Sequence, residues 1–520
     1  MIFLILKSLL FLLLAIPLML VLKDVMFLIN SRKYFKQKIH SKYSPLLGIY
    51  KYLGGSNINS PNQLTKFIKM FEIEDKAKNE KKTADLLLVN FPGNSTPALM
   101  LHDKDLLRDF AKIETEVSRK QDMARLPILN SFMYMDGKSA LEHRTIFSEI
   151  FYPSNLKKMT KNMKTIIERQ IQKIKQKLKN LPKNEQGFTA IELKQHTEEI
   201  FTDLVSYVLF GEDVPLVGGV KLTKLIVDAI GVWMQTSRTT LNILTFGLYR
   251  RMGFDPNYLR AKDQFSLIKK TIQETIQERK NSAGYVRGVN AIDLILDKNE
   301  KLEEEGKPEM KLSMDSIVDT MILLIFAGMD TSKNTSEFSL YHLSKNQALQ
   351  ERLRAEVVEK INNEGQKYSY EAYDENVLIN LFLKEILRVD GPAWISFSKH
   401  VTKDFKLGRY TIYKGTILII SYAALHQKNE YWDNPDRFDM ARFEDTARNR
   451  KFGKHGYQPF ALGKRACIGK NLGEISIKLL LASFLDAFEV MEPDEQPRKM
   501  LRAAFGLSSC KVKLRAIEAS

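Results

Sequence analysis

The chain has 520 residues, a formal net charge of +17, 44% hydrophobic residues and 27% charged residues. This composition is ordinary for a globular protein and excludes disorder along the whole chain. The only two cysteines, Cys467 and Cys510, exclude a disulfide framework and indicate a reducing compartment. Length alone suggests three or more domains, and the charge alone fits nucleic acid, anionic lipid or an acidic protein as a partner.

Residues 1–29 are predicted to form a transmembrane anchor. The chain from Ile2 to Leu22 is almost entirely apolar, and Lys7 can snorkel, so the run approaches the roughly 20 residues that span a bilayer. A cleaved signal peptide is the alternative, but no small-residue cleavage site follows the run. Residues 30–45 are interpreted as a basic linker, which places residues 46–520 in the cytosol by the positive-inside rule.

Helical spacing dominates the middle of the chain. Asn155–Leu181 is predicted to be a Lys-rich amphipathic surface helix whose charges form a solvated face. No aromatic interleaving or known nucleic-acid module accompanies these charges, so nucleic acid is not expected as a partner. Asn281–Lys311 is polar and predicts a loop or a short helix. A long apolar helix of about 33 residues, ~50 Å in length, is predicted from Ser313 to Asn346.

Two short strands are predicted late in the chain, at Tyr410–Tyr413 and Thr416–Ser421, with Lys414-Gly415 as the turn between them. The sequence contains neither a Gly-rich dinucleotide fingerprint nor a phosphate-binding loop. Any reducing equivalents must therefore come from another protein.

The segment 460–469, Phe-Ala-Leu-Gly-Lys-Arg-Ala-Cys-Ile-Gly, is the most informative in the chain. A glycine-interrupted loop leads into Cys467, and an apolar-periodic helix follows, so the helix N-terminus favours the thiolate. Gly463 and Gly469 allow close approach of the backbone to a flat group, and Arg465 offers a cation to a carboxylate. A buried structural cysteine is the alternative interpretation.

This segment resembles the haem-binding signature of the cytochrome P450 family at Phe460, Gly463, Arg465, Cys467 and Gly469. The resemblance covers roughly residues 43–513 and is strongest after Ser313. It implies a mainly α protein with small β-sheets, in one large helical catalytic domain behind the anchor rather than in three domains. It also implies haem b, held without covalent links, with Cys467 as the axial ligand of the iron.

Two other regions resemble the family in the expected order. Residues 327–332, Ala-Gly-Met-Asp-Thr-Ser, resemble its oxygen-binding segment, which implies that Asp330 and Thr331 assist proton delivery. A solvent-facing helical turn is the alternative for this segment. The resemblance further implies that Glu385, Arg388 and Arg442 form a cluster that braces the haem loop, although Met-Ala precedes Arg442 where the family usually has Pro-Glu.

The resemblance implies that Arg144, Arg465 and either Lys399 or His400 hold the haem propionates. Two departures from the family pattern occur near these residues. Ala140 stands where the family usually has Trp, and Lys399 stands where it commonly has Arg, which alone offers a bidentate fork.

The implied function is NADPH-dependent monooxygenation of an apolar substrate, with electrons from a separate diflavin reductase at the endoplasmic reticulum membrane. An acidic reductase surface would suit the basic residues around the cysteine loop, which are Arg448, Arg450, Lys451, Lys454, Lys464 and Lys470. Leu, Phe and Met are frequent in the segments expected to line the pocket, namely Met123–Met135, Val214–Arg251, Trp394–Phe397 and Ala503–Leu507. The alternatives are a haem-thiolate isomerase or dehydratase that needs no reductase, and a non-enzymatic membrane haem carrier.

Overall fold

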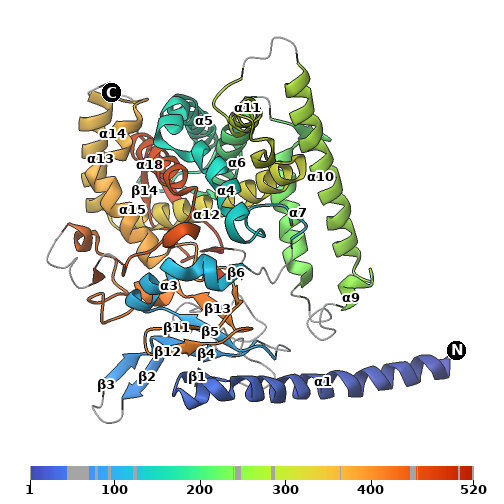
Figure 1. Cartoon of the computed structure of the whole chain (residues 1–520). Helices are drawn as coiled ribbons and strands as arrows, with labels where there is room; N and C mark the ends of the chain where they lie inside the picture. The colour runs from blue at the N-terminus through green and yellow to red at the C-terminus, as the bar shows by residue number, and fades with distance from the viewer. Residues whose placement is uncertain are drawn as a thin grey trace.

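A computed structural model of the chain shows a mainly helical body with the largest β-sheet along one side (Figure 1). The structure describes residues 2–43, 69–75, 80–91, 95–120, 126–212, 214–237, 239, 248–282, 287–363, 365–444, 452–453, 455–501 and 504–517. The α-helices are α1 (Ile2–Lys36), α3 (Lys104–Val117), α4 (Gly137–Ser148), α5 (Pro153–Lys179), α6 (Lys194–Phe210), α7 (Leu222–Ser237), α9 (Leu248–Arg251), α10 (Pro256–Asn281), α11 (Ala291–Glu304), α12 (Met314–Ser344), α13 (Gln347–Val357), α14 (Tyr370–Asp374), α15 (Val377–Val389), α16 (Tyr422–His426) and α18 (Lys470–Ala487). Short 3-10 or π turns cover Glu149–Phe151, Pro308–Met310, Val358–Asn363, Met440–Phe443 and Gly463–Arg465.

The strands are short and unevenly spaced along the chain. They are β1 (His40–Lys42), β2 (Glu72–Asp75), β3 (Glu80–Thr83), β4 (Leu86–Val89), β5 (Ala98–Leu101), β6 (Ser118–Lys120), β7 (Thr189–Glu192), β8 (Leu216–Val217), β9 (Val220–Lys221), β10 (Lys399–Val401), β11 (Phe405–Leu407), β12 (Tyr410–Ile412), β13 (Ile417–Ile420), β14 (Phe488–Met491), β15 (Lys499–Leu501), β16 (Phe505–Leu507) and β17 (Lys511–Ala516). The largest sheet has the order β1-β4-β5-β13-β10-β6.

The long central helix α12 confirms the helix predicted from Ser313 to Asn346. Ser313 caps it, because its side chain accepts a hydrogen bond from the backbone N–H of Ser316. Among the described residues, Pro308–Ser344 is the one helix long and apolar enough to cross a membrane, but 67% of its most apolar window is buried inside the protein. Such burial is typical of the core helix of a globular protein.

Contacts at two positions, Asp319 and Ser332, fix α12 along its length. Near its start, the Asp319 carboxylate accepts from the backbone N–H of Asn130 at 2.9 Å and pairs with Lys269 Nζ at 2.7 Å. Past its middle, a Cβ added at Gly473 of α18 would meet Ser332 Oγ at 3.8 Å. The central part of α12 therefore lies beside the start of α18, as Figure 1 also shows.

The predicted surface helix is α5, whose apolar residues face the core as expected. Met159, Met163, Ile167 and Ile171 are buried, whereas most of its lysines are exposed. The polar segment before α12 contains the short helix α11, within the range of structures predicted for it.

The two late strands do not pair with each other. Lys414-Gly415 forms a turn, as predicted, but β12 pairs with β11, whereas β13 pairs with β5 and β10. All four side chains of β13 are buried, as in a strand covered on both faces, while β12 alternates between buried and half-buried side chains. A shared turn thus connects two different sheets.

One continuous apolar core joins most of the helices and extends from Met70 to Leu514. The three domains suggested by chain length are therefore not present, and the single large helical domain is confirmed. A second core lies around the six-stranded sheet and includes Phe27 and Tyr34 of α1. Since α1 runs to Lys36, it continues past residue 29 through the first part of the predicted linker.

Candidate active site

The loop before α18 places Cys467 three residues ahead of the first helical residue, Lys470. The backbone N–H of Cys467 donates to the Phe460 carbonyl at 2.8 Å, which closes the loop, and the Cys467 side chain is exposed. Gly463 has φ +82°, and an added Cβ would lie 2.8 Å from the Ala111 carbonyl oxygen of α3. Only glycine fits there, so the loop packs directly against the α3 backbone.

Two guanidinium groups lie beside this loop, that of Arg465 buried and that of Arg144 half-buried. Arg144, from α4, donates to the Ala466 carbonyl, while Arg465 is 9% exposed and reaches the carbonyls of Phe132 and Met135 at 3.4 Å. Burial lowers the pKa of Arg144 to about 10, opposed by the nearby Cys467 and reinforced by Arg465. Within the described chain, neither guanidinium forms an ion pair with a carboxylate. Buried cations of this kind require anionic partners.

Lys399 and His400 differ in their surroundings although both lie on β10. Lys399 Nζ pairs with Glu114 Oε1 of α3 at 2.7 Å, and both side chains are buried. Alternation along a strand points His400 to the other face, where burial, and then Arg119, lower its pKa. Burial, and then Glu114 and Cys467, raise the pKa of the Tyr422 hydroxyl. Because Lys399 pairs with Glu114, its positive charge is already neutralised by a protein carboxylate.

The predicted oxygen-binding segment lies in the middle of α12. Ala327 is exposed there, although Ile325 and Met329 on the same helix are buried. The Thr331 hydroxyl donates to the Ala327 carbonyl at 2.7 Å, and Asp330 Oδ1 lies 3.3 Å from Lys333 Nζ. The Thr331 hydroxyl is therefore held on the turn of the core helix that is exposed at Ala327.

The predicted structural cluster is assembled in full. Arg388 makes a bidentate contact to Glu385, with Nε–Oε2 at 2.7 Å and Nη2–Oε1 at 2.8 Å, and Arg442 Nε lies 3.3 Å from Glu385 Oε1. All three side chains are buried, and the Asp439 backbone N–H also donates to Glu385 at 2.9 Å. Two arginines and one backbone N–H therefore share one buried carboxylate.

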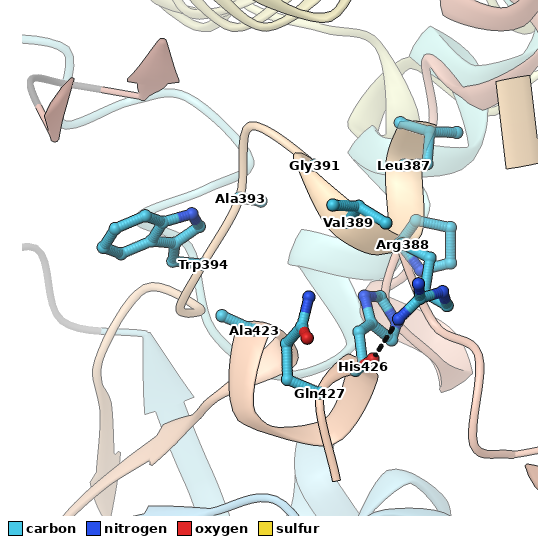
Figure 2. Close-up of a pocket in the computed structure, with 10 residues that line it drawn as sticks. Leu387, Arg388, Val389, Gly391, Ala393, Trp394, Ala423, His426 and Gln427 are labelled. Atoms are coloured by element: carbon cyan, nitrogen blue, oxygen red, sulfur yellow. Dashed lines mark hydrogen bonds between the residues drawn. The ribbon is translucent and has the colours of Figure 1, made fainter. Parts of the chain in front are cut away.

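The two arginines also bind backbone carbonyls of the segment that leads to the cysteine loop. Arg388 Nη1 donates to the His426 carbonyl at 2.9 Å, as Figure 2 shows, and Arg442 donates to the carbonyls of Asp433, Asn434 and Arg437. The cavity in Figure 2 has a volume of about 10 Å³, which is too small for a substrate. The cluster holds the path of the chain and does not line a binding pocket.

Sequence reasoning assigned no role to Glu114, Asp439 or His426. Glu114 carried a signal, because helical spacing puts it on the same face as the buried Leu107, Phe110 and Val117 of α3. An acidic residue on an apolar face predicts a buried cation nearby. Asp439 and His426 contact the cluster of Glu385, Arg388 and Arg442 through their backbone N–H and carbonyl, and such contacts carry no sequence signal.

Comparison with known proteins gives a match to the family model for cytochrome P450 over residues 69–515. The chain belongs to the cytochrome P450 family. A probable cytochrome P450 6d4 of Drosophila melanogaster is 24% identical over 426 residues, covering 76% of this chain and 78% of the relative. Cytochrome P450 CYP72A219 of Panax ginseng is 24% identical over 75% of this chain and 73% of its own length. An 11-oxo-beta-amyrin 30-oxidase of Medicago truncatula is 24% identical over 76% and 73%, respectively.

Membership of the P450 family makes the chain a haem-dependent monooxygenase, an oxidoreductase that uses dioxygen, a small-molecule substrate and a redox partner. The non-enzymatic haem carrier is thereby set aside. The cofactor of the family is haem b, and the residues present fit it. The buried Arg465 and the half-buried Arg144, which lack a carboxylate, suit its two propionates, and the exposed Cys467 carries a thiol of the soft kind that iron accepts.

Proposed function

We propose that this P450 is a single-pass protein of the endoplasmic reticulum membrane that oxidises an apolar substrate with electrons from an NADPH-dependent diflavin reductase. The observation that carries the proposal is the exposed Cys467 in a closed loop beside two guanidinium groups, of the buried Arg465 and the half-buried Arg144, that pair with no carboxylate among the described residues. Haem b supplies the oxygen activation when it is bound. We assign iron ligation, propionate binding and proton delivery to side chains of this chain, as follows.

We assign Cys467 as the axial iron ligand, and Arg144 and Arg465 as the partners of the propionates. Lys399 is paired with Glu114, so we assign it to the support of α3 against β10 instead. His400 is a further candidate partner of a propionate and faces away from that pair. We assign Phe460, Gly463 and Gly469 to the shape of the loop, since the Phe460 carbonyl accepts from the Cys467 N–H and an added Cβ at Gly463 would lie 2.8 Å from the Ala111 carbonyl oxygen.

We assign proton delivery to the Thr331 hydroxyl, supported by Asp330. The hydroxyl donates to the Ala327 carbonyl, which fixes its orientation, and its lone pairs are left to accept a hydrogen bond from a water that would carry the proton. The Lys333 ammonium keeps Asp330 near the same helical turn. Glu385, Arg388 and Arg442 hold the preceding chain in place and do not take part in the chemistry.

An apolar substrate is supported by the segments predicted to line the pocket. Phe132 and Met133 are buried, whereas Ile395 and Phe397 are 40% and 48% exposed despite their apolar character. Residues 123–125, 238, 240–247 and 503 of the predicted lining lie outside the described residues.

A separate reductase is supported by the basic residues next to the cysteine loop. Lys464 and Lys470 are exposed, while Arg448, Arg450, Lys451 and Lys454 lie outside the described residues. Cations around a redox centre favour an acidic electron donor. The anchor at residues 1–29, the linker at 30–45 and the catalytic domain at 46–520 complete the proposed arrangement.

Reconstitution of the full chain with a purified diflavin reductase tests the proposal. NADPH-dependent oxygen consumption should rise when an apolar substrate that shifts the haem spectrum is added. Turnover of a fatty-acid hydroperoxide in the absence of reductase, with no NADPH-driven product, would instead support the isomerase or dehydratase. A ligand screen by haem spectral shift across fatty acids, sterols and terpenoids would then define the substrate class.

A further inference from the structure

A groove lies where the end of α1 meets the sheet side of the body. Its volume is about 540 Å³, within the usual range for small-molecule sites. One wall is the last two turns of α1, and the other comes from the residues before β5 and the turn before β13. The lining residues are Ile29, Asn30, Arg32, Lys33, Lys36, Thr96, Pro97, Lys414, Gly415 and Thr416.

The groove has a strongly positive lining. Arg32, Lys33, Lys36 and Lys414 contribute four cations, and no Asp or Glu lines it. In the part of the chain that the structure describes, none of the four forms an ion pair, and Lys33 lies 3.9 Å above the Tyr413 ring. Asp404, which is outside the lining, accepts from the backbone N–H of Lys414. An uncompensated cluster of this kind attracts an anion.

The walls of the groove are held together by hydrogen bonds. Tyr34 of α1 bonds to the Thr416 hydroxyl and accepts from the Tyr413 backbone N–H, and the Gln37 amide pairs with the backbone of Thr411 at 2.7 and 3.1 Å. The Asn30 amide donates to the Ser95 carbonyl at 3.0 Å. The groove is therefore preformed by the docking of α1 onto the body.

The outer face of α1 changes character at the groove. Among the described side chains of α1, the exposed residues up to Ile29 are apolar, namely Leu18, Met19, Val21, Leu22, Val25, Met26, Leu28 and Ile29. The exposed residues that follow include Arg32, Lys33 and Lys36. From Ile29 to Lys36 the helix rises about 10 Å, close to the thickness of one headgroup layer of a bilayer. The cations thus begin where lipid hydrocarbon would end.

We propose that this groove binds the phosphate of an anionic glycerophospholipid, with the phosphate between Arg32, Lys36 and Lys414. The inference rests on the proposed membrane anchor, because only an anchored α1 brings the groove to the headgroup layer. Phosphate accepts hydrogen bonds from Lys and from the Arg fork, and juxtamembrane clusters of Lys and Arg bind anionic lipids. The acyl chains would lie along the apolar face that ends at Ile29.

Calorimetric titration of the full chain in uncharged detergent tests the site. The probes are dioctanoyl phosphatidic acid, dioctanoyl phosphatidylcholine and inorganic phosphate. The triple variant Arg32→Gln/Lys36→Gln/Lys414→Gln removes three groove cations. The control variant Lys158→Gln/Lys161→Gln/Lys179→Gln removes three exposed cations of α5, and therefore the same net charge.

Phosphatidic acid is expected to bind the wild type and the control within twofold of each other. The groove variant should bind it roughly a hundredfold more weakly, at about fivefold per cation removed. Equal affinity of the two variants would overturn the site. Binding of inorganic phosphate as tight as that of the lipid would overturn the lipid as the ligand, and equally tight phosphatidylcholine would overturn charge recognition.

The carbon monoxide difference spectrum separates the two proposals. Both variants should keep the thiolate-type spectrum, because none of the six residues touches the cysteine loop. If the wild type shows the thiolate-type spectrum but does not bind phosphatidic acid, only the lipid site is contradicted. If the wild type binds phosphatidic acid but lacks the spectrum, only the proposed function is contradicted.

Discussion

Lys399 of β10 and Glu114 of α3 form a buried ion pair, with Nζ and Oε1 2.7 Å apart and the two side chains 6% and 8% exposed. The pair joins the sheet to the helix against which the cysteine loop packs. Removing one partner of such a pair leaves a buried charge without compensation, whereas removing both does not. Lys399 therefore has a structural role, which can be tested by substitution of Glu114.

Glu114→Gln is expected to lower the free energy of unfolding by about 3–5 kcal/mol, because Lys399 loses its counter-charge in a buried site. Urea unfolding followed by far-UV circular dichroism measures the change. The double variant Glu114→Gln/Lys399→Met should recover at least half of the loss. A single variant as stable as the wild type would show that Lys399 does not need Glu114.

Glu385→Gln is expected to reduce haem retention and to destabilise the fold by about 3–5 kcal/mol, because two buried arginines share this carboxylate. The ratio of Soret to protein absorbance and urea unfolding measure the two effects. Glu351→Gln is the matched control, since Glu351 pairs with Arg354 at the same spacing but is 65% exposed. The control should change stability by less than about 0.5 kcal/mol, and equal effects would contradict the bracing role.

The stability of the fold should depend on pH through His426. Burial, and then Arg388, lower the pKa of His426 to about 3, and its Nε2 accepts from the Gln458 backbone N–H at 2.9 Å. The unfolded chain protonates at about 6.5, so this stabilisation is complete above that pH and decreases as the pH falls toward 3. Between pH 7 and pH 5 His426 should account for a loss of about 2 kcal/mol.

His426→Gln removes this titration while keeping an acceptor for the Gln458 N–H. Urea unfolding at pH 7 and pH 5 should therefore show a smaller loss in the variant than in the wild type, by about 2 kcal/mol. The same loss in both proteins would mean that other groups cause the dependence.

Cys467→Ala is expected to abolish the thiolate-type carbon monoxide spectrum, because the exposed sulfur of the closed loop is removed. Cys510→Ala is the control. Cys510 is buried, and burial, and then Glu337 and Glu192, raise the pKa of its thiol well above the ordinary value, so it should remain protonated and unable to bind iron. A spectrum retained in Cys467→Ala would rule out the assigned ligand.

Thr331→Ala is expected to keep the carbon monoxide spectrum and to increase the hydrogen peroxide formed per NADPH several-fold, since the oriented hydroxyl is lost. Peroxide and product measured together give the coupling. Thr331→Ser should stay close to the wild type because it keeps the donor to the Ala327 carbonyl. Unchanged coupling in the alanine variant would exclude the hydroxyl from proton delivery.

The sequence predicted the parts of the fold that are encoded locally. The boundaries of α12 follow from an uninterrupted apolar run and the Ser313 cap, and the cysteine loop follows from its glycines and the helix after it. The cluster at Glu385 was predicted only through the order of motifs, because Glu351 and Arg354 share its spacing. The local sequence pattern therefore predicted the helices and loops. The resemblance to the family was needed to decide which ion pair of that spacing belongs to the structural cluster.

The remaining features depend on tertiary contacts that spacing does not encode. The pairing of β13 with β5 instead of β12 joins segments more than 300 residues apart in the sequence. The residues of the Lys399–Glu114 pair are separated by almost as many residues. The continuation of α1 to Lys36 depends on packing of Phe27 and Tyr34 against the sheet. A basic composition at residues 30–36 predicts a solvated linker unless that packing is known.

The number of residues between Asp319 and Ser332 of α12 limits where insertions and deletions can occur in this enzyme. Asp319 is tied to Asn130 and Lys269, and Ser332 packs against Gly473, so the rotation of one point relative to the other is set by the residues between them. An extra residue in that interval would turn Thr331 by about 100° relative to Asp319. Insertions and deletions in descendants of this gene should therefore collect in the polar stretch ahead of α12 and spare the interval itself.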